Sequence, residues 1–166
     1  DLGDGWNVLL TDTVGFISKL PHNLIDAFHS TLEEAKYADY IIHVVDSSDP
    51  AISRNMDVVY RTLDDLDIKG KPVITVFNKD DIAWNAHPLF DRHADLTVHI
   101  SAKTGRGIDD LKRAMMRILL GSMTQIREVI PYTEGSRLER IRTTGHITKE
   151  EYRPDGVYVE AYIPRY

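Results

Sequence analysis

Apolar and polar positions form two kinds of pattern along the first three quarters of the chain, which are short apolar runs and apolar residues at helical spacing. Short apolar runs rich in strand-forming residues predict strands at residues 6–11, 40–46, 73–77 and 96–100. Apolar residues at helical spacing predict helices that begin near Pro21, after Asp49-Pro50 and near Ile108. Strands that alternate with helices indicate an α/β fold with a parallel sheet and helices on both faces.

Two of these elements have more specific signals. Residues 40–46 are apolar on both faces, as parallel strands covered by helices tend to be. Asp49 and Pro50 together predict an N-cap and a first-turn proline for the helix that follows.

The pattern changes after Gly121. Residues 127–132 predict a strand, residues 134–142 a short helix, and residues 146–153 and 157–163 two strands joined by a turn at Pro154-Asp155-Gly156. The tail from residue 124 carries seven basic and seven acidic side chains, whereas the whole chain has a net charge of −6. We therefore predict a boundary near residues 122–126 between an α/β domain (residues 1–123) and a small α+β domain of βαββ order (residues 124–166).

Composition excludes several classes of protein. With 166 residues the chain is long enough to bury a core without disulfides or metals. The absence of cysteine excludes a disulfide scaffold, a thiol nucleophile and a cysteine-ligated zinc site. The negative net charge argues against general electrostatic binding to nucleic acid or anionic lipid. No apolar run is long enough to predict a membrane span. Because the sequence starts at Asp1 without methionine, we expect a fragment of a longer chain.

Three polar turns follow predicted strands at their carboxyl ends, the edge where open α/β sheets bind ligands. In Asn78-Lys79-Asp80-Asp81, the Asp81 carboxylate could accept hydrogen bonds from N1–H and the amino group of guanine, a pattern that adenine does not offer. Asn78 could tie this turn to its neighbours, and the aliphatic part of Lys79 could lie over the purine. A solvated turn with no ligand is the alternative.

The other two turns are individually weak signals. In Ser101-Ala102-Lys103, the small Ala102 would let a backbone N–H approach the guanine O6 atom, and Ser101 could brace the base-binding turn. In the turn at residues 12–15 (DTVG), Asp12 could hold Mg²⁺ through a water molecule, and Gly15 would let a backbone N–H approach a γ-phosphate. The occurrence of all three turns in this order, each after its own strand, argues for a guanine-nucleotide site.

The order DTVG, NKDD and SAK resembles the third, fourth and fifth motifs of GTP-binding domains. Residues 9–48 (LLTDTVGFISKLPHNLIDAFHSTLEEAKYADYIIHVVDSS) are, more narrowly, similar to the HflX family of ribosome-associated GTPases. Residues 150–164 (EEYRPDGVYVEAYIP) resemble the small C-terminal domain of that family. The resemblance covers essentially the whole chain.

This resemblance implies a cytoplasmic GTPase that uses GTP or GDP with Mg²⁺, binds the RNA and proteins of the large ribosomal subunit, and helps to split or rescue stalled ribosomes. Asp12 would take the Mg²⁺ role, Gly15 the γ-phosphate role, and residues 16–32 would form the switch. Asn78, Lys79, Asp81 and Ala102 would contact the base. The complete set of nucleotide-binding candidates is Asp12, Thr13, Val14, Gly15, Asn78, Lys79, Asp80, Asp81, Ser101, Ala102 and Lys103.

Two features depart from a complete GTPase. Phe16 stands where Ras-like enzymes carry the glutamine that orients the attacking water, so the catalytic residue stays unassigned. The sequence also lacks a G-x-x-x-x-G-K-[ST] motif; Gly105-Arg106-Gly107 is the nearest approach. We expect the P-loop to precede Asp1, the isolated chain to bind GTP weakly without hydrolysing it, and its unpaired strand edges to favour a swapped oligomer.

Two other functions stay open. The chain could be a nucleotide-independent module that binds the ribosome or a protein, or part of another small GTPase of translation or ribosome assembly. Arg137, Arg140 and Arg142 predict a solvated helix face, with RNA or ribosomal protein as the alternative contact. The seven histidines have no metal-ligand spacing.

Overall fold

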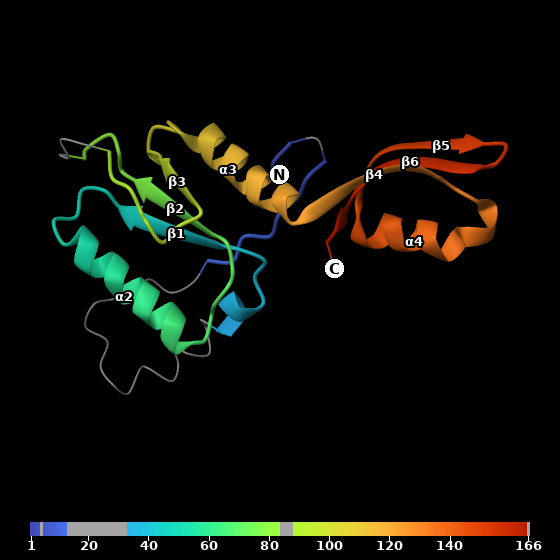
Figure 1. Cartoon of the computed structure of the whole chain (residues 1–166). Helices are drawn as coiled ribbons and strands as arrows, with labels where there is room; N and C mark the ends of the chain where they lie inside the picture. The colour runs from blue at the N-terminus through green and yellow to red at the C-terminus, as the bar shows by residue number, and fades with distance from the viewer. Residues whose placement is uncertain (4, 13–32, 84–87, 166) are drawn as a thin grey trace. The chain divides into compact units, whose positions relative to one another are not determined.

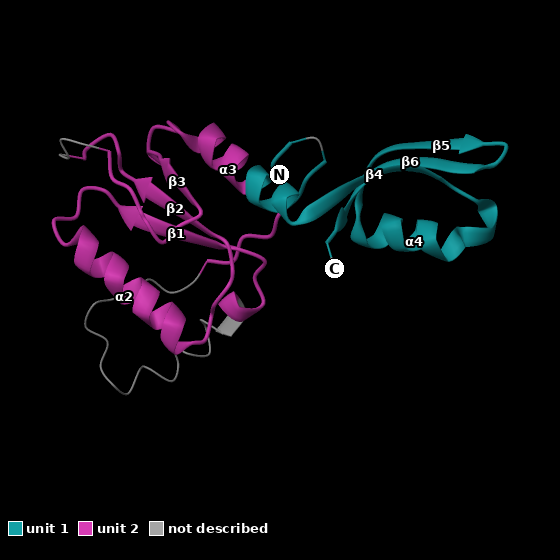
Figure 2. Ribbon diagram, in the orientation of Figure 1, with its two compact units in different colours: residues 1–7, 116–166 teal, residues 8–115 magenta. Residues whose placement is uncertain are grey.

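The computed structural model describes residues 1–3, 5–12, 33–83 and 88–165. The chain divides into two compact units, one formed by residues 8–115 and the other by residues 1–7 together with residues 116–166 (Figure 2). The division lies within the last predicted helix of the first domain. The predicted domain boundary near residues 122–126 therefore stays a prediction.

Three parallel strands form the sheet of the larger unit: β1 (Ile41–Asp46), β2 (Val73–Asn78) and β3 (Leu96–His99). They lie in the order β1-β2-β3. The register pairs Asp46 with Asn78, so the polar ends of β1 and β2 lie side by side. The central strand β2 is buried over its first five residues, as its apolar sequence predicts. The parallel α/β fold is confirmed.

Helix α2 (Ile52–Asp65) connects β1 to β2, and α3 (Ile108–Gly121) follows β3. Figure 1 shows α2 and the first half of α3 on opposite sides of the three strands. Val59 and Leu63 are the buried residues of α2, in agreement with its predicted apolar face. The predicted cap is wrong in detail, because the N-cap residue is Ala51 and has no side-chain cap hydrogen bond. Asp49 instead accepts hydrogen bonds from the Ala51 N–H and the Asn55 amide, both at 2.8 Å.

The predicted strand at residues 6–11 is wrong. Trp6 forms only an isolated bridge with Gly3, and residues 7–12 have no regular secondary structure. A strand is stable only when its backbone N–H and C=O groups pair with a neighbour. No strand of the described part of the chain pairs with this segment, and its Leu9 and Leu10 side chains are 93% and 65% exposed. Apolar character alone therefore does not make this segment a strand.

Trp6 has a different role, within the smaller unit. Its ring stacks on His146 with the centroids 3.9 Å apart, and it meets the edge of the Tyr162 ring at 5.7 Å. Trp6 is buried as a result. Aromatic packing on the C-terminal sheet thus anchors the first residues of the chain.

The C-terminal part of the smaller unit is a three-stranded antiparallel sheet with one helix. Its elements are β4 (Met123–Ile130), the 3-10 turn η3 (Tyr132–Glu134), α4 (Gly135–Thr144), β5 (His146–Arg153) and β6 (Gly156–Pro164). The strands lie in the order β4-β6-β5 in the sheet. Along the chain a strand is followed by a helix and two strands, in agreement with the predicted βαββ order. Strand β4 starts four residues earlier than predicted.

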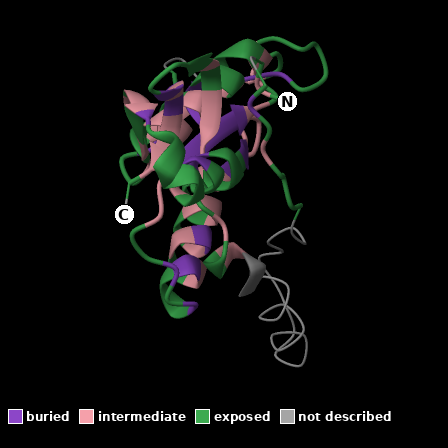
Figure 3. Cartoon of the chain, turned by 90° about the vertical axis from the view of Figure 1, so that its right-hand side faces the viewer, coloured by how far each residue is buried: buried purple, intermediate pink, exposed green. Residues whose placement is uncertain are grey.

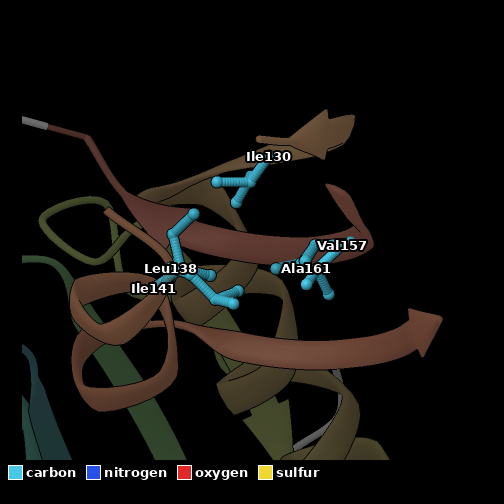
Figure 4. Close-up of a cluster of buried hydrophobic side chains, with 6 residues drawn as sticks. Ile130, Leu138, Ile141, Val157 and Ala161 are labelled. Carbon is cyan, nitrogen blue, oxygen red and sulfur yellow. The ribbon is translucent and has the colours of Figure 1, made fainter. Parts of the chain in front are cut away.

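This unit has a hydrophobic core of its own. Leu138 and Ile141 of α4 point toward the sheet (Figure 4). The buried side chains of the cluster are Ile130, Leu138, Ile141, Val157, Val159 and Ala161. The core follows from the alternation in β6, where residues 157, 159 and 161 lie on one face.

The burial of side chains differs from the sequence prediction in strand β1. Buried residues gather on the strands and on the inner faces of the helices (Figure 3). Within β1, however, Val44 is 60% exposed, so this strand is not covered on both faces as predicted.

The helix predicted from Pro21 lies mostly outside the described residues, which resume at the short 3-10 turn η2 (Glu33–Lys36). Over the described residues, no helix has the length and apolar character that a membrane crossing requires.

Candidate functional site

A tight turn at the end of β2 carries Asn78, Lys79, Asp80 and Asp81. Lys79 has a φ of 63°, a left-handed conformation that is uncommon for a residue with a side chain. The Asp80 N–H donates to the Ile100 carbonyl at 3.0 Å, and the Ile82 N–H donates to the Lys79 carbonyl at 3.0 Å. These bonds fix the turn against the end of β3.

A second loop, residues 101–107, joins β3 to α3. Ser101 is completely buried at its start, and its N–H donates to the Arg106 carbonyl at 2.9 Å. Gly107 has a φ of +76°, and a Cβ atom there would lie 2.2 Å from the His99 carbonyl oxygen. The loop can therefore return this close to β3 only with glycine at this position.

Side chains join the two loops directly. The Ala102 N–H donates to the Asn78 Oδ1 atom at 2.9 Å. The Ser101 hydroxyl hydrogen-bonds the Asp81 carboxylate, and this bond holds the pKa of Asp81 below its usual range. The structure thus brings together four of the predicted residues from two adjacent strand ends. The bond to Asn78 agrees with the expectation that Asn78 ties its turn to a neighbouring loop. The expected approach of a backbone N–H to guanine O6 stays a prediction.

A small open pocket lies where the two loops meet. Its volume is about 220 Å³, and its lining residues are Asn78, Lys79, Asp81, Ile82, Ser101 and Lys103. Pockets for drug-sized ligands typically measure about 300–1,000 Å³. The pocket therefore has room for a ring system such as a nucleobase.

The Lys79 ammonium group reaches across to the first strand of the sheet. Its Nζ atom lies 2.6 Å from the Asp46 Oδ2 atom, and the Ser48 N–H and hydroxyl donate to Asp46 Oδ1 at 2.9 and 2.6 Å. The bond from Lys79, followed by that from Ser48, lowers the pKa of Asp46 to about 2. Sequence reasoning missed Asp46 as part of this site. The sequence signal was its place at the end of the predicted strand at residues 40–46. The register that puts it beside Asn78 comes from the structure.

The remaining candidates are not gathered at the pocket. Asp80 turns away from it, toward Arg106 and His99. Asp12 is exposed on an irregular segment. Thr13, Val14 and Gly15 lie outside the described residues, as does Phe16. Their predicted roles stay predictions.

Two of the three basic residues of α4 are engaged within their own unit. Arg137 donates to both Glu128 carboxylate oxygens at 2.7 Å, and Arg142 bonds Glu150 and the Tyr152 hydroxyl. These ion pairs neutralise much of the positive charge with which α4 could bind an RNA phosphate. They favour the expected solvated helix face over an RNA contact.

Comparison with protein families gives a match over the first half of the chain. Residues 2–79 match the model of a family described as 50S ribosome-binding GTPases. This segment contains the DTVG motif and the first two residues of the NKDD turn. It ends before the loop of Ser101 and before the C-terminal sheet.

Comparison with curated proteins extends over the whole chain. GTPase HflX of Lacrimispora saccharolytica is 50% identical over 163 residues, which cover 98% of this chain and 38% of that protein. GTPase HflX of Escherichia coli is 35% identical over 159 residues, covering 94% of this chain and 37% of that protein. The chain thus spans a little over a third of the length of these relatives.

A solved structure matches the fold. A GTP-binding protein from the archaeon Sulfolobus solfataricus, determined in complex with GDP, aligns with a TM-score of 0.57 and 27% identity. The alignment covers 64% of this chain and 39% of that protein.

Proposed function

Because this chain belongs to the HflX family of GTP-binding proteins, we propose that it supplies the base-recognising part of a guanine-nucleotide site together with a C-terminal domain at residues 124–166. The observation that carries the proposal is the meeting of Asn78, Asp81 and Ser101 at one small pocket, with the Ala102 N–H bonded to Asn78 beside it. The GDP complex of the archaeal structural relative supports the same reading.

The chemistry of Asp81 provides the specificity. Its carboxylate is exposed at the pocket, and the bond from the Ser101 hydroxyl lowers its pKa and so further favours the ionised form. An ionised carboxylate accepts two hydrogen bonds, from N1–H and the 2-amino group of guanine. Adenine has neither donor at these positions and would leave the carboxylate unpaired, at a cost of about 1–3 kcal/mol. The pocket therefore selects guanine.

The test is a titration of the chain with fluorescently labelled GDP and ADP, repeated with Asp81→Asn. We expect weak GDP binding, weaker ADP binding, and loss of GDP binding in the variant. Asparagine offers an N–H donor to the 2-carbonyl of xanthine, so Asp81→Asn should bind xanthosine diphosphate better than the wild type does. Asp57→Asn, on the exposed side of α2, is the matched control and should bind GDP as the wild type does.

Two results would contradict the proposal. One is equal binding of GDP and ADP by the wild type. The other is the same GDP affinity in Asp81→Asn and in Asp57→Asn, because binding would then not use the Asp81 carboxylate.

Asp12 and Gly15 would serve the phosphate end of the nucleotide. Mg²⁺ prefers oxygen ligands and commonly keeps several water molecules, and the exposed Asp12 carboxylate fits such a water-mediated contact. Gly15 would bring a backbone N–H to the γ-phosphate, with residues 16–32 as the segment that responds to it. In the complete protein these residues would act in GTP hydrolysis.

The large ribosomal subunit is the proposed partner, in the cytoplasm, with splitting or rescue of stalled ribosomes as the role of the complete protein. The family described as 50S ribosome-binding GTPases supports this proposal. Co-sedimentation of the chain with isolated large subunits tests it, and the absence of any co-sedimentation would contradict it.

A nucleotide-independent binding module is the second candidate. It is favoured by the separate hydrophobic core of the C-terminal unit, which does not share side chains with the pocket. Co-sedimentation that is the same with and without GDP, and the same for Asp81→Asn, would favour this candidate over the nucleotide-dependent one.

A further inference from the structure

Two consecutive aspartates at the end of β2 face different partners. Asp81 faces Ser101, whereas Asp80 lies between a guanidinium and an imidazole from the neighbouring loop and strand. The Asp80 Oδ2 atom is 3.2 Å from Arg106 NH2, and its Oδ1 atom is 3.5 Å from His99 Nδ1. The Asp80 side chain is only 22% exposed, so its carboxylate is largely covered by its surroundings.

His99 is itself held on three sides. Its Nε2 atom lies 2.9 Å from the Leu89 carbonyl oxygen, and its ring stacks on Phe77 with centroids 5.2 Å apart. The Leu89 carbonyl, the Phe77 ring and the Asp80 carboxylate thus surround the imidazole. His99 thereby connects the turn after β2 with the segment that leads into β3.

Arg106 connects Asp80 to the second loop. Its guanidinium pairs with Asp80, and its backbone carbonyl accepts the Ser101 N–H at 2.9 Å. Ser101 in turn bonds the Asp81 carboxylate. The chain of contacts therefore runs from Asp80 through Arg106 and Ser101 back to the next residue, Asp81.

We propose that Asp80 is a positioning residue for guanine recognition, which with Arg106 and His99 fixes the Asp81 carboxylate at the place of the guanine 2-amino group. This inference rests on the proposed function. Arg106 is 70% exposed, and ion pairs with such exposed partners contribute little to folding. The main effect of the contact is on the geometry of the pocket and not on the stability of the chain.

Competition binding with GDP and inosine diphosphate (IDP) tests the proposal, because hypoxanthine differs from guanine only by the missing 2-amino group. The wild type should prefer GDP by about tenfold, the value of one charge-assisted hydrogen bond. Asp80→Ala should lose most of this preference, because GDP donates to Asp81 from two groups and weakens more than IDP, which donates only from N1–H. Arg106→Ala, which keeps the backbone bond to Ser101, should show the same loss, whereas the control Asp57→Ala should keep the wild-type preference.

Amide hydrogen exchange supplies a measurement that needs no nucleotide. In Asp80→Ala the Ser101 and Ala102 amides should exchange faster than in the wild type, with the amides of α2 unchanged. A GDP-to-IDP preference equal to the wild-type value in Asp80→Ala overturns the inference, and so does unchanged exchange at Ser101 and Ala102. If the wild type binds no guanine nucleotide, the proposed function fails for this chain, and the exchange rates alone decide whether Asp80 holds the two loops together.

Discussion

At the scale of single residues, the larger unit contains a group of buried polar side chains around Asp91. Asp91 is almost completely buried and accepts hydrogen bonds from the Tyr60 and Thr75 hydroxyls at 2.5 and 2.6 Å. His43 of β1 lies beside them, with its ring edge-on to Tyr60. Its Nδ1 atom is buried without a hydrogen-bond partner among the described residues. A charge on this imidazole would be poorly solvated.

Stability should therefore fall when His43 takes up a proton. Burial lowers the pKa of His43 below its usual value of 6.5, and the nearby Asp91 opposes this only in part. As the pH falls below 6.5, the unfolded chain binds the proton first, so the free energy of unfolding decreases until the folded-state pKa is passed. We expect His43→Phe, which keeps the ring, to have a shallower decrease over the same pH range in urea unfolding.

The control for this prediction is His93→Phe. His93 also contacts the Tyr60 ring but is exposed. Its replacement therefore removes a histidine from the same region without removing a buried one. Identical pH slopes for the wild type and His43→Phe would contradict the assignment.

At the scale of elements, two segments of similar composition behave differently. Residues 41–46 form a strand because β2 pairs with all six of them. Residues 6–11 are also apolar, yet they form no strand over the described part of the chain. A neighbouring strand decides whether such a segment becomes a strand. The backbone of a strand makes its hydrogen bonds with its neighbour, whereas a helix makes its hydrogen bonds within itself. The helices α2, α3 and α4 accordingly appear close to their predicted positions.

The two units should respond separately to loss of core side chains. Ile141 packs only in the C-terminal cluster, and Leu63 lies in a second cluster with Val59, Leu66 and Ile68. We expect Ile141→Ala to cost about 2–5 kcal/mol in the C-terminal sheet and little in β1–β3, and Leu63→Ala to do the reverse. Residue-resolved hydrogen exchange measures both, and equal losses in the two units for either variant would contradict their independence.

At the scale of the whole molecule, exposed apolar groups stand out on the larger unit. Leu9 and Leu10 precede the DTVG motif, and Val44 lies on β1, a strand at the edge of the described sheet. Unprotected strand edges and exposed apolar groups promote pairing between chains. We propose that the isolated chain self-associates through this region, which includes a swapped oligomer as one form.

Light scattering after size exclusion tests this proposal. The wild type should show a concentration-dependent increase in mass, and Val44→Lys should reduce it because lysine protects strand edges. Phe90→Lys replaces another exposed apolar residue of the same unit and should leave the association unchanged. A monomer at every concentration would contradict the proposal.

Most of the larger elements and the meeting of the turns after β2 and β3 could be predicted from the sequence, and the details could not. The polar turns after β2 and β3 were predictable because the carboxyl ends of parallel strands share one edge. The pairing of Lys79 with Asp46 was not, because it depends on the register of β1 against β2. The bond from the Ala102 N–H to Asn78 was equally inaccessible, because it depends on a loop conformation.

The sequence by itself determined the α/β order, the small βαββ tail and the identity of the guanine-binding candidates, because apolar periodicity and turn residues are local properties. Only the tertiary structure decided which apolar segments became strands and that Asp80 faces Arg106 and His99. It also showed that Trp6 packs on His146 and Tyr162. These outcomes depend on partners distant along the chain, and only folding brings such partners together.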